Sequence, residues 1–262
     1  MNRQTLKEFT AFAEYLADSS AKIALQYFRK NCGEQVKSND TPVTLADQQI
    51  EKKLREEITG QFSSHGIIGE EFKNINADAD YQWIIDPIDG TSSFIIGRPI
   101  FGTLIALTYK NSPLLGIINQ PISGERWLAV KGEGSKLNNQ IIKTRKCSDI
   151  ADAVFCSTSP FYFKGKELEI FNKIRSKTKY QSSGGVFCGG DCYSYGLLAS
   201  GFIDIIIETG LSNYDYTALI PVIEEAGGII TDWQGKKLDL NSDGRIIACG
   251  DQELHRHLLG YF

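Results

Sequence analysis

The chain has 262 residues, of which 42% are hydrophobic and 23% charged, with a formal net charge of -4. These values are typical of a globular protein with a sizeable core, and the length allows one large domain or two joined halves. The chain has no basic block, which disfavours nucleic acid as a partner, and no apolar run of ~18 residues that would predict contact with a membrane. There is no apolar signal core at the N-terminus and the cysteines are scattered, so we expect reduced thiols and a cytoplasmic protein.

The N-terminal part is predicted to begin with two helices. Apolar residues at helical spacing predict a long amphipathic helix over residues 4–30. The polar stretch at 32–42 contains glycine and proline and is predicted to be a loop. A second helix is predicted after Thr44, which with Asp47 three residues later resembles a capping pair.

Strands are predicted next, followed by alternating strands and helices. Residues 83–86 are predicted to form a buried strand that enters a tight turn at 87–90, and residues 101–130 a three-stranded antiparallel meander. Pro221 disfavours a regular helix in the segment around it. The remaining predicted elements are strands near 152–157, 203–208, 229–233 and 245–249, helices near 166–176, 191–200 and 216–226, and a short terminal helix.

This order indicates mixed sheets layered between helices, which is an α/β (layered α+β) architecture. A boundary is predicted near residue 145. It separates an N-terminal half, 1–145, that carries most of the acidic motifs from a C-terminal half, 146–262, that contributes Asp215 and substrate-recognition residues.

Acidic residues in three short segments predict a metal site. Glu70 follows an apolar pair, Asp86 and Asp89 follow an apolar strand, and Asp215 stands just before a predicted helix. Magnesium takes oxygen ligands, usually one or two carboxylates with waters and substrate phosphate. Carboxylates placed at strand ends could supply such a set, so the combination predicts a site for a metal and a phosphate.

Each segment alone also has an ordinary structural interpretation. The motif from Asp86 to Gly90 occurs as a simple tight turn, and Glu70 with its acidic neighbour could be a solvated pair. Asp47 and Asp215 could each cap a helix. Because all of the segments occur together, the functional interpretation is favoured.

Phosphatase mechanisms that use a protein nucleophile fit the sequence poorly. No cysteine is followed by arginine six residues later, and Asp86 and Asp89 are separated by two residues where an aspartyl-phosphate route needs one. The histidines His65, His255 and His257 are interpreted as surface residues. Of the phosphatase mechanisms considered, direct attack on phosphorus by a metal-activated water is the one that remains compatible with the sequence.

These motifs resemble the inositol monophosphatase family over nearly the whole chain. The matching segments are residues 37–47, the Gly-Glu-Glu motif at 69–71, residues 83–91, the Tyr-Asp pair at 214–215 and the Glu-Ala-Gly-Gly motif at 225–228. The resemblance implies the αβαβα five-layer sandwich, a magnesium-dependent phosphomonoesterase and a homodimer.

The resemblance also implies the metal ligands. Glu70, Asp86 and the carbonyl of Ile88 would hold one Mg²⁺, and Asp86, Asp89 and Asp215 a second. A weaker third ion would lie near Glu70.

Roles in catalysis and substrate binding follow from the same resemblance. Glu70 and Thr91 would position the attacking water, with Asp47 orienting the Thr91 hydroxyl. The backbone amides of Gly90 and Thr91 would bind the phosphate, as they could if a helix starts there. Glu208 would reach the alcohol portion of a small phosphorylated substrate.

Several segments resemble the histidinol-phosphatase branch of the family more than the inositol-hydrolysing branch. The latter tends to have tryptophan where Tyr214 stands, and small neutral residues where this chain has Gly190 and Asp191. We therefore expect histidinol phosphate as substrate, in histidine biosynthesis, with Asp191 facing its cationic groups; alternatively, Asp191 simply caps its helix. Further segments similar to this branch are 92–104, 116–127, 219–222 and 231–233.

Three other functions stay open. The first is hydrolysis of inositol phosphate or another polyol phosphate, and the second is hydrolysis of a bisphosphorylated nucleotide, for which we expect a more basic pocket. The third is a catalytically silent binding protein, which would have lost a ligand. The chain retains all five acidic positions: Asp47, Glu70, Asp86, Asp89 and Asp215.

Overall fold

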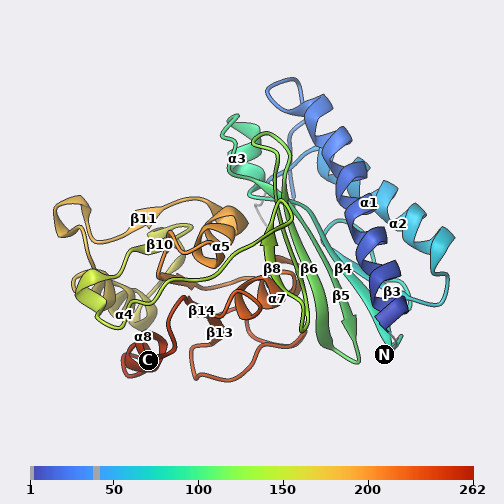
Figure 1. The fold of residues 1–262 in the computed structure, drawn as a ribbon. Coiled ribbons are helices and arrows are strands. Elements are labelled where there is room, and N and C mark those ends of the chain that lie inside the picture. Colours follow the sequence, from blue (N-terminus) through green and yellow to red (C-terminus); the bar gives the residue numbers. More distant parts are fainter. Residues whose placement is uncertain (1–2, 38–41) are drawn as a thin grey trace.

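Two β-sheets alternate with three layers of helices to form an αβαβα sandwich (Figure 1), as predicted. The computed structural model describes residues 3–37 and 42–262. One outer layer consists of α1 (Arg3–Tyr27) and α2 (Leu45–Gln61), the middle layer of α5 (Asp191–Ala199), α6 (Asn213–Tyr216) and α7 (Leu219–Glu224), and the other outer layer of α4 (Lys166–Arg175) and α8 (Gln252–Leu259). No helix in the described ranges combines the length and apolar character needed to cross a bilayer.

The first sheet has seven strands in chain order. Only its first pair is parallel, and the other pairs are antiparallel, so the predicted meander is confirmed. The strands are β3 (Gly66–Gly69), β4 (Tyr81–Asp89), β5 (Gly102–Tyr109), β6 (Ser112–Gln120), β7 (Glu125–Val130), β8 (Gly134–Leu137) and β9 (Gln140–Ile141).

The second sheet has five strands in the order β11-β10-β12-β14-β13. The boundary predicted near residue 145 falls between the two sheets, while the division into two domains stays a prediction. The strands are β10 (Phe155–Ser157), β11 (Phe187–Cys188), β12 (Ile205–Glu208), β13 (Ile229–Asp232) and β14 (Ile246–Cys249).

Short elements complete the fold. The predicted loop at 32–42 is partly wrong, because β1 (Gln35–Val36) and β2 (Pro42–Val43) pair antiparallel; residues 38–41 lie outside the described residues. Strands of two residues are held by backbone hydrogen bonds and are too short to show a periodic side-chain pattern, so the sequence did not predict this pairing. The other short elements are α3 (Thr91–Ile95) and 3₁₀ turns at Ile150–Asp152, Pro160–Tyr162 and Gln181–Ser183.

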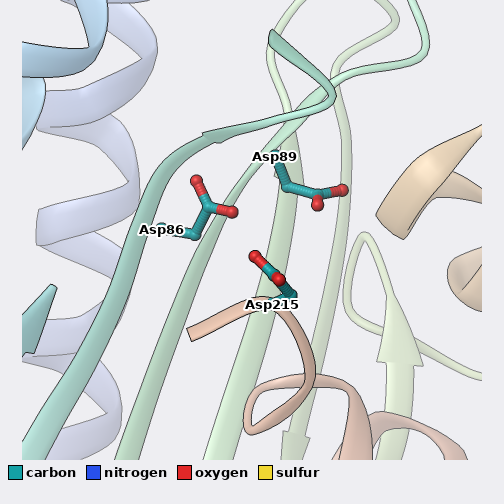
Figure 2. A group of neighbouring side chains, drawn as sticks. All are labelled: Asp86, Asp89 and Asp215. Atoms are coloured by element: carbon teal, nitrogen blue, oxygen red, sulfur yellow. The ribbon is translucent and has the colours of Figure 1, made fainter. Parts of the chain in front are cut away.

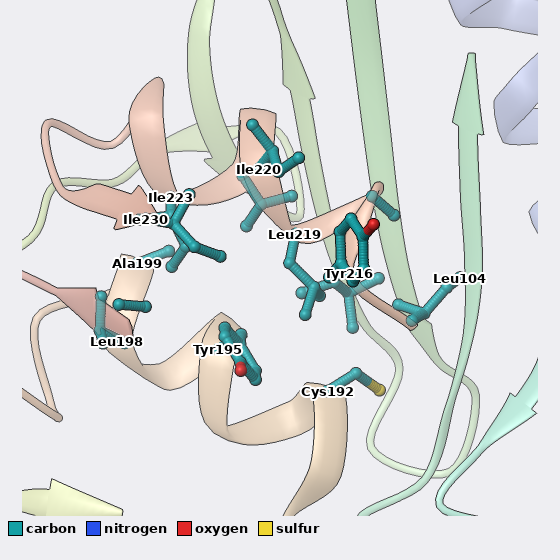
Figure 3. Close-up of a cluster of buried hydrophobic side chains, with 14 of the residues drawn as sticks. Leu104, Cys192, Tyr195, Leu198, Ala199, Tyr216, Leu219, Ile220, Ile223 and Ile230 are labelled. Carbon is teal, nitrogen blue, oxygen red and sulfur yellow. The ribbon is translucent and has the colours of Figure 1, made fainter. Parts of the chain in front are cut away.

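Three hydrophobic cores hold the layers together, one under each outer helical layer and one between the two sheets. The first joins α1 and α2 to the seven-stranded sheet, and the third joins α4 and α8 to the five-stranded sheet. The middle core lies between the two sheets (Figure 3), where Tyr195 and Leu198 of α5 pack beside Leu219 and Ile223 of α7. Burial of these apolar side chains is the main term that stabilises the stack.

The helix predicted over 216–226 is present but shorter, as α7, and a separate helical turn, α6, precedes it and ends at Tyr216. Pro221 has no N–H and cannot bond to the carbonyl of Thr217, so the helical hydrogen-bond pattern breaks between them. This break leaves Asp215 in a separate helical turn.

One of the three histidines is buried and a second is half-buried, which corrects the prediction. His255 is buried on α8, with Nε2 2.8 Å from the Thr231 hydroxyl. His65 stacks between Phe62 and Tyr81 and accepts a 3.2 Å bond from the Trp83 indole. An imidazole has an apolar body, so it can be buried when its polar atoms are paired.

Candidate active site

A β-bulge brings Asp86 and Asp89 to the same side of β4. Asp86 pairs with Leu104 and Asp89 with Gly102, so three steps along β4 match two along β5. In a regular strand, residues three apart point to opposite faces, and one extra residue reverses that relation. The tight turn predicted at 87–90 is therefore wrong in kind: the strand continues to Asp89 and bends through a bulge.

Asp215 completes a cluster of three carboxylates. Figure 2 shows Asp86 and Asp89 on β4 grouped with Asp215, which points toward them from α6. One oxygen from each lies within 4.8 Å of the others. Burial, together with the neighbouring negative charges, raises the pKa of Asp86 and Asp89, and burial raises that of Asp215 to about 7. In the described part of the chain, none of the three forms an ion pair with lysine or arginine.

Backbone amides orient each carboxylate of this cluster. Asp86 accepts a 3.0 Å bond from the Ile88 amide, and Asp215 accepts a 2.7 Å bond from the Ser212 amide in a capping box. Asp89 accepts a 2.5 Å bond from the amide of Cys192 in the first turn of α5. Two distant segments are thereby joined at the cluster.

Glu70 directly follows β3 and is near enough to affect the cluster electrostatically. Its charge raises the pKa values of Asp86 and Asp215. Its Oε1 lies 2.9 Å from Lys37 Nζ, which also lies 2.7 Å from Glu71. Burial acts to lower the pKa of Lys37, but its bonds to the two glutamates outweigh burial and raise it.

Asp47 and Thr91 lie close together beside Ile88. The Thr91 hydroxyl donates to the Ile88 carbonyl at 3.0 Å and lies 3.4 Å from Asp47 Oδ1. Asp47 Oδ2 accepts bonds from the amide and hydroxyl of Thr44, which confirms the capping pair. Burial raises the pKa of Asp47 to about 6, against the lowering effect of Thr44.

Gly90 and Asp191 lie against each other. Gly90 has φ +84° and precedes α3, and a Cβ added to it would lie 2.7 Å from Asp191 Oδ2. Gly190 caps α5, so the alternative in which Asp191 is the N-cap is wrong. Asp191 instead adopts φ +43°, an unusual conformation for a non-glycine residue, and its carboxylate lies 3.4 Å from the Ser93 hydroxyl.

A cavity of about 150 Å³ extends from the cluster toward the second sheet. Its walls include Asp89 and Asp215 on one side and Glu208 on the other, with Asp191 also lining it. Glu208 is buried; its Oε1 accepts a 2.6 Å bond from the Thr158 amide, and its Oε2 has no partner among the described residues. Burial raises the pKa of Glu208 to about 8.

The sequence did not indicate two further polar groups here. The Tyr195 hydroxyl, in a residue that lines the cavity, is buried without a partner in the described chain, and the buried Ser157 hydroxyl lies close enough to the Glu208 carboxylate to lower its pKa. Tyr195 lies on the face of α5 that packs into the middle core, so helical spacing alone marks it as a core residue. Unpaired buried polar atoms are uncommon and need an explanation such as a ligand.

Three convergent carboxylates beside a polar cavity can bind a hard divalent cation and place a phosphate ester next to it. This combination of fold and site is that of a phosphomonoesterase. A model of the inositol monophosphatase family matches residues 5–262, and the chain belongs to that family. It is accordingly a phosphoric monoester hydrolase.

Similar proteins include enzymes named for different substrates. The bifunctional phosphatase IMPL2 (chloroplastic) of Arabidopsis thaliana is 44% identical, over 97% of this chain and 75% of that protein. A histidinol-phosphatase of Chlorobaculum parvum is 36% identical over 89% of each chain. The solved structure of an inositol monophosphatase from Zymomonas mobilis is 42% identical, has a TM-score of 0.87 and covers 97% of each chain.

Proposed function

We propose that this protein hydrolyses histidinol phosphate to histidinol and phosphate, as a step of histidine biosynthesis. The observation that carries the proposal is the unpaired Oε2 of buried Glu208, in a cavity that Asp191 also lines and that opens onto the carboxylate cluster. Histidinol phosphate has an ammonium and an imidazole that can donate to such oxygens. The similarity to a histidinol-phosphatase supports the same substrate.

The donor set fits Mg²⁺. Asp86, Asp89 and Asp215 offer oxygen atoms close together with no cation paired to them in the described chain, and Glu70 is near enough for its charge to raise the pKa of Asp86. Glu70 and the Ile88 carbonyl would complete the ligand set. Two or three ions would share these ligands. Mg²⁺ held here supplies positive charge to the phosphoryl oxygens and makes a water more acidic.

The protein side chains then position the reactants. Glu70 and Thr91 would hold the attacking water, and Asp47 would orient the Thr91 hydroxyl, from which it lies 3.4 Å. The amides of Gly90 and Thr91, at the start of α3, would bind the phosphate. We propose attack by water without a phosphoenzyme, in a cytoplasmic homodimer.

A polyol phosphate such as inositol 1-phosphate is the second candidate substrate, favoured by the 42% identity to an inositol monophosphatase. Glu208 and the Tyr195 hydroxyl could also accept bonds from polyol hydroxyls. The test is the kcat/KM of the wild-type protein for histidinol phosphate, inositol 1-phosphate and glycerol phosphate at saturating Mg²⁺. We expect the kcat/KM for histidinol phosphate to exceed the values for the other two substrates by at least about tenfold, which is the effect of one charge-assisted hydrogen bond. Equal values, or a higher value for inositol 1-phosphate, would contradict the proposal.

A further inference from the structure

Three charged residues lie along one face of α2. Asp47, Glu51 and Arg55 are four residues apart, which places them one above the other on a helix. All three are buried, and Arg55 is only 7% exposed. Asp47 belongs to the candidate site, whereas Glu51 and Arg55 contact a different segment.

Glu51 holds the chain immediately after Glu70. Its Oε2 accepts a 2.7 Å bond from the Glu71 amide, and its Oε1 accepts a 3.2 Å bond from the Phe72 amide. The Glu51 carboxylate therefore binds two consecutive N–H groups at the end of β3. Hydrogen bonds to an ionised acceptor are about twice as strong as neutral ones, so this is a firm attachment.

Arg55 binds both Glu51 and the carbonyl groups of the same turn. It donates to Glu51 Oε1 at 2.7 Å, and two further guanidinium nitrogens donate to the carbonyls of Phe72 and Lys73 at 2.9 and 3.0 Å. The guanidinium has donors in a rigid planar arrangement that suits several acceptors at once. The pair thus holds both the N–H and the C=O groups of the turn after Glu70.

Gly69, which precedes Glu70, leaves room for this carboxylate. A Cβ added to Gly69 would lie 2.2 Å from Glu51 Oε1. Any larger residue at 69 would displace the Glu51 carboxylate from the turn. The glycine is therefore explained by close approach of a side chain.

We propose that Glu51 and Arg55 are positioning residues that hold Glu70 in place for cation binding. The inference rests on the proposed function, in which Glu70 is a ligand. Glu70 contacts Lys37 and lies among acidic neighbours, so a loose turn would let it move away from Asp86. Because α2 also carries Asp47, one rigid helix sets both acidic groups relative to the end of β4.

The test compares Glu51→Gln with a matched control, Asp204→Asn. Asp204 is also a buried carboxylate that pairs with an arginine, Arg145, and accepts a bond from a backbone amide, but it lies at the far end of β12 from Glu208. Both variants should lose thermal stability. Only Glu51→Gln should weaken Mn²⁺ binding to the metal-free protein, measured by electron paramagnetic resonance, by about 10–100-fold.

Kinetics give a second measurement. Glu51→Gln should raise the Mg²⁺ concentration for half-maximal activity in the same proportion, with KM at saturating Mg²⁺ changed by less than about threefold. Gly69→Ala disturbs the same contact by changing the turn rather than Glu51. It replaces Glu51→Gln as the test variant if Glu51→Gln does not fold. Unchanged Mn²⁺ affinity in a folded Glu51→Gln or Gly69→Ala protein, or an equal loss in Asp204→Asn, would overturn the proposal. A wild-type protein that binds Mn²⁺ but hydrolyses no phosphate ester would defeat the proposed function and leave this binding comparison intact.

Discussion

The two sides of the active-site cavity differ in the kind of partner that is missing: a positive charge on one side and a hydrogen-bonding group on the other. On the side of the first sheet, Asp86, Asp89 and Asp215 each have a backbone amide as partner, yet no positive charge is paired with them in the described residues. On the opposite side, Glu208 of the second sheet and Tyr195 of the middle helix α5 are buried with hydrogen-bonding atoms unpaired.

The difference indicates separate tasks. A group of like charges in a partly buried site is costly unless a cation binds, so the first side is suited to holding metal and activating phosphate. Unpaired acceptors are costly unless a donor arrives, so the second side is suited to the alcohol portion of the substrate. Mutations on the two sides should therefore change different kinetic quantities.

The largest effect is expected on the metal side. Asp86→Asn should lower kcat by at least about 10³-fold for every substrate, because it removes a ligand expected to contact two ions. Chelation of the wild-type protein should abolish activity, and added Mg²⁺ should restore it. The control is Asp204→Asn, whose folded fraction should keep kcat within about threefold. Substantial activity in the chelated protein or in Asp86→Asn would contradict the division of tasks.

A smaller and selective effect is expected for Asp191. Asp191→Asn preserves the shape and removes the charge, so kcat/KM for histidinol phosphate should fall by roughly 10–100-fold, equivalent to ~1.5–3 kcal/mol. Glycerol phosphate has no cationic group, so its kcat/KM should stay within about threefold. Equal losses for both substrates would show that Asp191, which also contacts Ser93 and lies against Gly90, acts structurally.

Glu208 should give a pH-dependent effect. Burial raises its pKa to about 8 from an ordinary value of 4.5, so the folded state retains a proton that the unfolded state releases as pH rises. Its contribution to stability is therefore present at low pH and declines between pH 4.5 and 8. Glu208→Gln does not titrate. It should be more stable than wild type at pH 8, by at least about 1 kcal/mol, with little difference at pH 4.5.

The same substitution should affect recognition. Without the Glu208 carboxylate, kcat/KM for histidinol phosphate should fall several-fold, and the ratio of wild type to Glu208→Gln should rise as pH approaches 8. Chemical denaturation at several pH values and matched kinetic profiles measure the two effects. A constant ratio across this range would remove Glu208 from the binding of a cation.

The smallest effect is expected away from both sides. Burial lowers the pKa of His65, and the Trp83 indole donates to its Nδ1. Protonation is thus disfavoured in the folded state, so the stability from this contact is present above about pH 6.5 and is lost as pH falls. His65→Phe should lose up to about 1 kcal/mol at pH 7.5 and less at pH 5, with kcat unchanged. A change in kcat would show that the contacts of His65 affect catalysis at the site.

Much of the architecture was predictable because local patterns encode it. Helical spacing, the capping pair at Thr44 and Asp47, and the antiparallel meander all appear in the structure. The errors occur where long-range pairing or one residue overrides a pattern. Examples are the β1–β2 pair, the bulge between Asp86 and Asp89 where a tight turn was predicted, and the burial of His255.

The family could be inferred from the sequence alone, and the acidic residues proposed for the site could be singled out, because short motifs such as those at Glu70, Asp86 and Asp89 are contiguous in the chain. The three-dimensional fold was needed to show that a bulge turns Asp86 and Asp89 to one side, that Asp89 binds the first turn of α5, and that Glu51 and Arg55 hold the turn after Glu70. It also decided which polar atoms, such as Glu208 Oε2, are buried without a partner. These properties depend on distances between segments far apart in the chain, and packing of the two sheets around the middle helices sets those distances.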